Sequence, residues 1–216
     1  MSGWHSDRIG YGPQYYNELL NDIELTINSS NLEIVHSYLM NNVDAFCFFE
    51  TDGLIKENVQ LNNKDNLMAV DLLSIACNLD SNDPTSTTTL IAIDLPHDSL
   101  VDVNGDLSIR LKNKIKEVKL WKNWVQENRK TFISKIVKTI EKEKTEYDLE
   151  KEIKDMLIRH VNYGIYDKYL IISGRREYLN ISNRMMLAQT NKELDPIKII
   201  TYDALLSGIR KKIRFN

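Results

Sequence analysis

The chain has 216 residues, of which 42% are hydrophobic and 27% are charged, and its formal net charge is −3. This length and apolar content suit one domain with a buried core. No stretch approaches the ~18 consecutive apolar residues of a membrane span, and segment 1–12 lacks the apolar run of a secretory signal. We therefore expect a cytoplasmic protein without membrane contact, with Cys47 and Cys77 as buried free thiols.

Charge is distributed unevenly along the chain. From Asp44 to Asp106 there are twelve acidic and two basic residues, whereas from Leu107 to Asn216 there are twenty-five basic and fourteen acidic residues. Solvated helix faces account for most of these lysines. The remaining alternatives are an internal electrostatic match between the two parts or a partner bound by the basic part.

Two helices are predicted near the N-terminus. Apolar residues recur at helical spacing over Tyr15–Thr26, and the polar run Asn28–Asn31 ends that pattern. Ser30 with Glu33 three residues later forms a capping box that predicts a second helix, which ends at Asn41 and Asn42.

Three strands are predicted next. Ala45–Phe49 is short, apolar and aromatic, Leu67–Ala76 is nearly continuous apolar chain, and Thr89–Leu95 is ended by Pro96. The intervening stretch Asn78–Thr88 is predicted to be a polar loop.

The second half is predicted to be a long helix followed by alternating strands and helices. The long helix covers Asp106–Ile140 and continues as a charged helix over Glu141–Lys154. The following elements are a strand at Tyr169–Ser173, a helix at Ile181–Gln189, a strand at Ile197–Thr201 and a helix at Asp203–Ile209. This order predicts an α/β fold with a mixed central sheet flanked by helices.

Three carboxylates stand where strands and helix could bring them together. Asp71 lies within one predicted strand, Asp94 near the end of the next, and Glu117 in the long helix. Carboxylate oxygens are the ligands that Mg²⁺ prefers, and a metal ion can activate water and offset charge in phosphodiester cleavage. These three residues are the candidate metal ligands, with Mg²⁺ or Mn²⁺ as the ion.

Seven further segments are informative through their order and spacing, namely Leu32–Asn42, Val70–Leu73, Leu90–Pro96, Val103–Ser108, Leu120–Val125, Leu170–Arg175 and Ile199–Leu206. Together they resemble the nuclease domain of the Shedu anti-phage family, a branch of the PD-(D/E)XK superfamily. The similarity runs from about Asn31 to Arg210. The resemblance implies a restriction-endonuclease-like core over residues 31–216, preceded by a helical extension over residues 1–30.

Carried over position by position, the family's catalytic set is largely replaced. Asp71 matches the first metal-binding acid. Counted back from Pro96, the position of the family's glutamate holds Ala92 and that of its lysine holds Asp94, and Glu117 stands at the position of its glutamine. A carboxylate in place of an ammonium repels phosphate by about 1 kcal/mol even when well solvated. The resemblance thus predicts a nuclease fold with impaired catalysis.

A rearranged active site is the alternative. Ala92, Asp94 and Pro96 share one face of their strand, so Asp94 could still face the site. Asp71, Asp94 and Glu117 would then form an all-carboxylate site for Mg²⁺, with Lys119 as the catalytic cation. That arrangement would make the protein an active metal-dependent endonuclease.

Two basic segments are candidates for nucleic-acid contact. Arg175 and Arg176 follow Gly174 at a strand-to-helix turn, where backbone amides and guanidinium groups suit a phosphate. Lys211 and Lys212 belong to a basic C-terminal segment that we expect to be exposed and partly disordered. The alternative is that these cations are solvated surface residues.

We therefore expect a prokaryotic or phage-borne protein that acts in antiviral defence by binding DNA, RNA or a protein partner, with homo-oligomer formation open. Two other readings remain open, an active endonuclease and an interaction module that binds no nucleic acid. The convergence of the strand before His97, the strand around Leu72 and the long helix is the condition on which the nuclease resemblance depends.

Overall fold

The computed structural model describes residues 5–6, 13–28, 32–42, 53–62, 67–78, 85–142, 154–155, 157 and 165–215. Along the chain the elements are β1 (His5–Ser6), α1 (Pro13–Ile27), α2 (Leu32–Asn41), β2 (Gly53–Asn62), β3 (Leu67–Asn78), β4 (Thr85–Ile93), α3 (Ile109–Glu127), α4 (Arg129–Lys142), β5 (Ile165–Ile172), η2 (Arg176–Tyr178), α6 (Ile181–Glu193), β6 (Ile197–Ile200) and α7 (Tyr202–Phe215).

The described strands form one sheet in the order β1-β2-β3-β4-β5-β6. The pairs from β1 to β4 are antiparallel, and β4-β5 and β5-β6 are parallel. Parallel neighbours require a crossover connection, which α3 and α4 provide between β4 and β5 and α6 provides between β5 and β6. The predicted α/β fold with a mixed sheet flanked by helices is confirmed.

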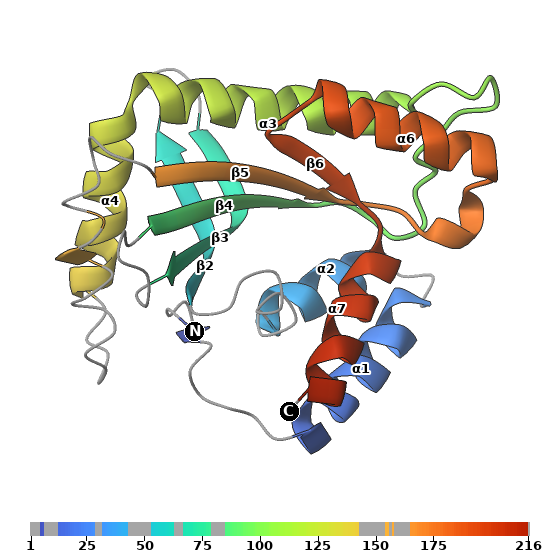
Figure 1. Ribbon diagram of the computed structural model, residues 1–216, viewed down its shortest axis with the longest axis horizontal. Coiled ribbons are helices and arrows are strands. Elements are labelled where there is room, and N and C mark those ends of the chain that lie inside the picture. Colours follow the sequence, from blue (N-terminus) through green and yellow to red (C-terminus); the bar gives the residue numbers. More distant parts are fainter. Residues whose placement is uncertain are drawn as a thin grey trace.

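Helices cover both faces of the sheet (Figure 1). On one face Leu90 and Ala92 of β4 pack with Trp121 and Trp124 of α3, in a core that α4 and α6 also enter. On the other face α1, α2 and α7 pack against neighbouring strand residues such as Ile91. Because successive strand residues point to opposite faces, Ala92 and Asp94 are directed toward the α3 side.

The sheet contacts required by the predicted convergence are present. β3 pairs with β4 from Leu72↔Ile91 to Asn78↔Thr85, and α3 packs on the same two strands. The strands β3 and β4 are therefore neighbours in the sheet, and the tryptophan-bearing helix α3 packs against them.

Several element boundaries differ from the sequence prediction. The strand β2 was not predicted, and the segment assigned to a polar loop contains the start of β4 at Thr85. The predicted helix Asp106–Ile140 is two helices that meet at Asn128. There the Asn128 backbone N–H and side-chain amide both donate to the carbonyl of Trp124, which ends α3.

The C-terminal basic segment also differs from the prediction. Arg210, Lys211 and Arg214 continue α7 instead of leaving it as a disordered end. The predicted strand Ala45–Phe49, Cys47, the capping residue Ser30 and most of the charged helix Glu141–Lys154 lie outside the described residues, as does the side chain of Cys77.

The helix of the predicted N-terminal extension is part of the packed core. Tyr16, Leu19, Ile23 and Ile27 of α1 are buried and share a cluster with α7. The division into residues 1–30 and 31–216 stays a prediction. No helix in the described ranges combines the length and apolar content that a membrane crossing needs.

Candidate functional site

The site lies where β3 and β4 separate. Their ladder ends at Leu72↔Ile91, while β3 continues its pairing with β2 to Leu67 and β4 continues its pairing with β5 to Ile93. Asp71 precedes Leu72 in the chain and so lies one residue beyond the end of the β3-β4 ladder. Its Oδ2 accepts the backbone N–H of Ile93 at 2.7 Å. The carboxylate thus takes the place of a lost backbone acceptor at this opening.

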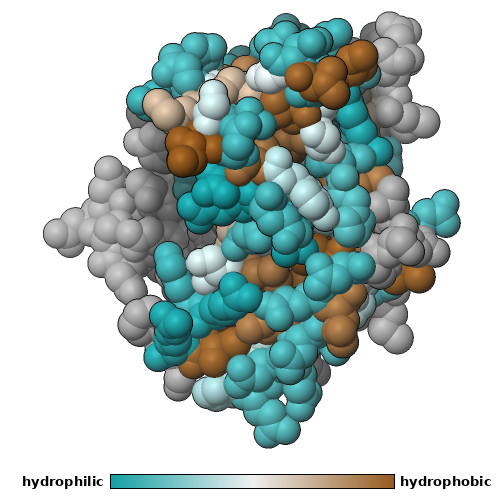
Figure 2. Space-filling model, turned by 90° about the vertical axis from the view of Figure 1, so that its right-hand side faces the viewer, coloured by the Kyte–Doolittle hydropathy of each residue, from teal (hydrophilic) through white to brown (hydrophobic). Residues whose placement is uncertain are grey.

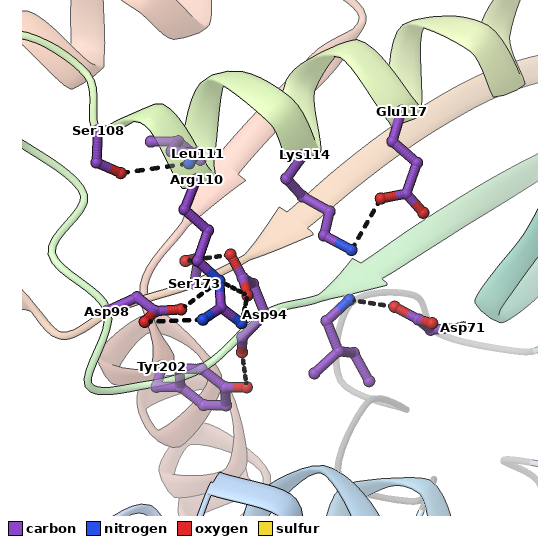
Figure 3. Close-up of polar contacts among 11 residues, drawn as sticks. Asp71, Asp94, Asp98, Ser108, Arg110, Leu111, Lys114, Glu117, Ser173 and Tyr202 are labelled. Carbon is purple, nitrogen blue, oxygen red and sulfur yellow. Dashed lines mark hydrogen bonds and ion pairs between the residues drawn. The ribbon is translucent and has the colours of Figure 1, made fainter.

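One row of α3 points toward this opening. Ser108 begins the helix, and its Oγ accepts the N–H of Leu111 at 3.2 Å. Arg110, Lys114 and Glu117 then follow at i, i+4 and i+7, which places them on one side of the helix. Figure 3 shows the three side chains directed toward the ends of the strands.

Asp94 is held by Arg110 in a largely buried cluster. Its side chain is 3% exposed, and its Oδ1 lies 2.7 Å from Nη2 and 2.9 Å from Nε of Arg110. Ser173 Oγ donates to Oδ2 at 3.4 Å. The hydroxyl of buried Tyr202 donates to the Asp94 backbone carbonyl. Asp94 is therefore fixed from three parts of the fold, namely α3, the end of β5 and α7.

The same guanidinium also binds Asp98. Arg110 Nε lies 2.8 Å from Asp98 Oδ2, and Nη1 lies 3.2 Å from Oδ1. Burial raises the pKa of the Asp98 carboxyl, and the neighbouring Asp94 carboxylate raises it further, while Arg110 acts against both. Two carboxylates thus share one cation, and removal of Arg110 would leave them facing each other.

Asp71 belongs to a second, more open group. Lys114 Nζ lies 2.9 Å from Glu117 Oε2, and the Glu117 side chain is 43% exposed. Burial raises the pKa of the Asp71 carboxyl, and Glu117 raises it slightly. The Ile93 N–H, Lys114 and His36 of α2 oppose this shift. Lys114 therefore stabilises charge on Asp71 and pairs with Glu117 as well.

An open pocket of about 330 Å³ lies beside the two groups. Its walls come from α2, the end of β4 and the inner row of α3. The residues that line it are Glu33, His36, Ser37, Ile93, Asp94, Leu95, Arg110 and Lys114.

The predicted site residues are only partly brought together. Asp71 and Glu117 both interact with Lys114, whereas Asp94 belongs to the separate Arg110 cluster (Figure 3). Lys119 is exposed and lies about 200° around the helix from Glu117. The cation beside Asp71 is Lys114, which the sequence reasoning missed.

Arg110 and Asp98 were missed as well. The spacing of Arg110, Lys114 and Glu117 on the buried-side flank of the helix was visible in the sequence and could have indicated that these residues face the strands.

The donor set does not suit a divalent ion in this arrangement. Across the described ranges no three His, Cys, Asp or Glu side chains lie together as a group that could hold a metal ion. Ala92 is fully buried and packs in the α3 core, Asp94 is bound by Arg110, and the ammonium of Lys114 occupies the space beside Asp71 and Glu117. The arrangement therefore does not support a cleavage step that depends on Mg²⁺ or Mn²⁺.

The two basic segments have different environments. The Arg175 side chain is 13% exposed, donates to Asn28 Oδ1 at 2.9 Å and lies 3.5 Å from Asp203. It joins the end of α1 to the start of α7. Arg176 and Lys211 are exposed, and the side chain of Lys212 lies outside the described residues. The nucleic-acid role of these four residues stays a prediction.

The turn before Arg175 depends on a glycine. Gly174 has a φ of 62°, and a Cβ there would lie 2.8 Å from Leu100 Cγ and 2.9 Å from the carbonyl oxygen of Asp98. The β5 end is thereby pressed against the loop that carries Asp98.

A comparison with family models gives one match, described as Shedu protein SduA, C-terminal, over residues 28–206. This range holds most of the chain, including Asp71, Asp94, Asp98, Arg110, Lys114 and Glu117. The chain belongs to the Shedu family. No curated protein matches the sequence significantly. Ala92, which we predicted to stand at the position of the family's glutamate, is buried, and Asp94, which we predicted to stand at that of its lysine, is bound by Arg110.

Proposed function

We propose that this Shedu protein acts in anti-phage defence by binding nucleic acid, without the metal-dependent cleavage of a PD-(D/E)XK nuclease. The observation that carries the proposal is the ion pair of Asp94 with Arg110, at 2.7 Å and with Asp94 almost completely buried. A carboxylate that already has a tightly bound guanidinium is a poor ligand for a second cation.

The proposal includes a restriction-endonuclease-like core, and the arrangement of β3, β4 and α3 supports that part of it. The antiparallel β3-β4 pair carries Asp71 and Asp94, and α3 packs on it. In such a core, cleavage would need acids that are free to hold a metal ion and a cation that is free to offset phosphate charge. Here Lys114 is paired with Glu117 and Arg110 with two aspartates.

The basic composition of the second half supports nucleic acid as the partner. Helices α3 and α4 together contain eleven basic and three acidic residues. Such an excess attracts phosphates through a term that weakens steeply with salt. A protein partner or a second copy of the chain is the alternative, and failure to bind nucleic acid at low salt would favour it.

A combined cleavage and binding assay tests the proposal. Purified protein is incubated with linear DNA and with RNA in Mg²⁺, in Mn²⁺ and in EDTA, and binding is followed by fluorescence anisotropy. We expect intact nucleic acid in every condition and binding that persists in EDTA.

Metal-dependent cleavage by this protein would contradict the proposal and favour an active endonuclease with rearranged carboxylates. An Asp71→Ala variant purified in parallel separates the protein's own activity from contamination. Cleavage that the variant retains in full comes from a contaminant.

A further inference from the structure

Helix α3 carries two rows of basic side chains on opposite flanks of its buried stripe. Counting about 100° per residue, Arg110 and Lys114 lie on one flank with Glu117, while Lys112, Lys116 and Lys119 lie on the other. The first flank faces the acidic residues of the sheet (Figure 3). The second flank faces away from them.

The second row has no charge partner within the protein as described. Lys112, Lys116 and Lys119 are all exposed, and none of their side chains forms an ion pair or hydrogen bond with any described residue. Like charges three and four residues apart destabilise a helix by about 0.2–0.5 kcal/mol per pair. The repulsion within the row therefore slightly destabilises the helix, and no contact with a described residue offsets it.

Uncharged polar residues extend this row. Asn123 and Gln126 are exposed and fall on the same flank as Lys119. The first acidic side chain after Lys119 on this helix is Glu127, in its last turn. From Lys112 to Gln126 the row spans about 21 Å of helix, over which one strand of a duplex presents about six phosphates.

We propose that this row, Lys112, Lys116, Lys119, Asn123 and Gln126, is the surface that holds the phosphodiester backbone of nucleic acid. Lysine and side-chain amides are typical donors to phosphate oxygens and position a nucleic acid without reading its sequence. The proposal rests on nucleic-acid binding as the function, and it places the contact outside the pocket that Asp94 and Lys114 line.

A nucleic acid fits this row better than an apolar peptide does. Two exposed apolar side chains of α3, Ile109 and Leu120, lie outside the row. Others, such as Tyr178, Ile181 and Met185, belong to η2 and α6, and Figure 2 shows hydrophobic and hydrophilic side chains mixed on the face at the right of Figure 1. The α3 row itself is entirely polar. A straight polar row with a single sign of charge matches a regularly charged polymer.

A pair of matched triple variants tests the surface. The row variant is Lys112→Gln with Lys116→Gln and Lys119→Gln. The control variant is Lys138→Gln with Lys192→Gln and Lys198→Gln, which removes three exposed cations elsewhere and changes the net charge equally. We measure binding over a salt series for three labelled ligands. They are a 20-base-pair DNA, an RNA duplex of the same sequence and poly-glutamate. Circular dichroism and urea unfolding confirm that each variant is folded.

For the row variant we expect DNA affinity at 0.1 M salt to fall on the order of 100-fold, and the slope of log K against log salt to decrease by about 2 to 3. The control variant should change affinity by less than about threefold.

Four results would overturn the surface proposal. Equal losses in both variants would assign the effect to net charge, and unchanged binding by the row variant would place the contact elsewhere, while nucleic-acid binding itself stands. Poly-glutamate binding as tight as DNA binding would make the row a general site for acidic proteins. Absence of wild-type binding at low salt would reject the proposed function together with this surface.

Discussion

Asp94 and Asp71 lie near each other at the opening between β4 and β3, yet the protein holds them in opposite ways. Asp94 is 3% exposed and is bound by Arg110, Ser173 and the Tyr202 contact to its own backbone. Asp71 belongs to the more open group, where it accepts one backbone N–H and interacts electrostatically with Lys114. Asp94 is therefore held by several side chains of the fold, whereas Asp71 has fewer direct contacts.

This difference predicts that substitutions on the two sides have different effects. The Asp94 side is stabilised by contacts that span β4, the loop after it, α3 and β5, so changes there should cost folding stability. The Asp71 side depends on one lysine, so changes there should alter ion binding and pH dependence instead. The following predictions test that contrast.

The largest effect is expected from Gly174→Ala, on the Asp94 side. The substitution places a Cβ 2.8 Å from Leu100 Cγ in a left-handed backbone conformation. The conformational strain and the clash together should lower the free energy of unfolding by about 2–4 kcal/mol, measured by urea denaturation.

Gly105→Ala is the matched control for that measurement. Gly105 also has a positive φ of 86°, but nothing lies within 4 Å of its Cβ position. Its cost should be the conformational strain alone, about 1 kcal/mol. Equal losses for the two alanine variants would show that the contact with the Asp98 loop is not tight.

Arg110→Met should destabilise the protein by about 2–3 kcal/mol at pH 7. The value lies below the cost of breaking a fully buried pair, because the Arg110 side chain is 51% exposed. Without the guanidinium, Asp94 and Asp98 repel each other, and the pKa of Asp98, already raised by burial, should rise further. A raised carboxyl pKa stabilises the folded state only at low pH, so the loss should increase as the pH rises above about 4.

Two further variants check the cause. Lys112→Met removes a cation two residues away on the exposed flank of the same helix and should change stability by less than about 0.5 kcal/mol. Adding Asp98→Asn to Arg110→Met should restore part of the loss. A loss that is independent of pH and unaffected by Asp98→Asn would show that Arg110 acts through packing.

The element order was predictable from the sequence, and the reasons for the exceptions are physical. Helical spacing predicted α1, α2, α6 and α7, because each buries one apolar side. Strand β2 was missed because its sequence contains polar residues throughout, and β3 stabilises it by backbone pairing along its length. The break at Asn128 was missed because the apolar spacing continues across it, from Trp124 to Phe132, whose rings are in edge contact.

Three acids of the candidate site could be named from the sequence, whereas Asp98 and the cations could not. Asp71, Asp94 and Glu117 stood out because carboxylates within or beside apolar segments are unusual. Their partners depend on how α3 is rotated against the sheet, which places Arg110 against Asp94 and Lys114 beside Asp71. That rotation is set by the packing of Trp121 and other core residues, and composition alone does not reveal it.

Lys114→Met tests whether the open group can accept a divalent ion once its ammonium is removed. Asp71 and Glu117 would then face each other without a cation, and Mn²⁺ should stabilise the variant by about 1.4 kcal/mol at ten times its Kd. We expect no such stabilisation of the wild type. Lys119→Met, with the same change in net charge, is the control. Stabilisation of the wild type by Mn²⁺ would mean that the acids do bind a metal and would favour the endonuclease alternative.

The smallest effect is expected from Asp71→Asn, which keeps an oxygen acceptor for the Ile93 N–H and removes the charge. At pH 7 the free energy of unfolding should change by less than about 1 kcal/mol. Because burial raises the pKa of Asp71 despite Lys114 and His36, ionisation disfavours the folded state. The wild type should therefore lose stability relative to the asparagine variant as the pH rises above about 3.9, the value in an unfolded chain.

Asp71→Ala separates the effect of the charge from that of the hydrogen bond, because it also leaves the Ile93 N–H unpaired and should cost about 1–3 kcal/mol at every pH. A wild type that instead gains stability relative to Asp71→Asn with rising pH would show that Lys114 outweighs burial. The carboxylate would then be as firmly held as that of Asp94, and the contrast between the two regions would disappear.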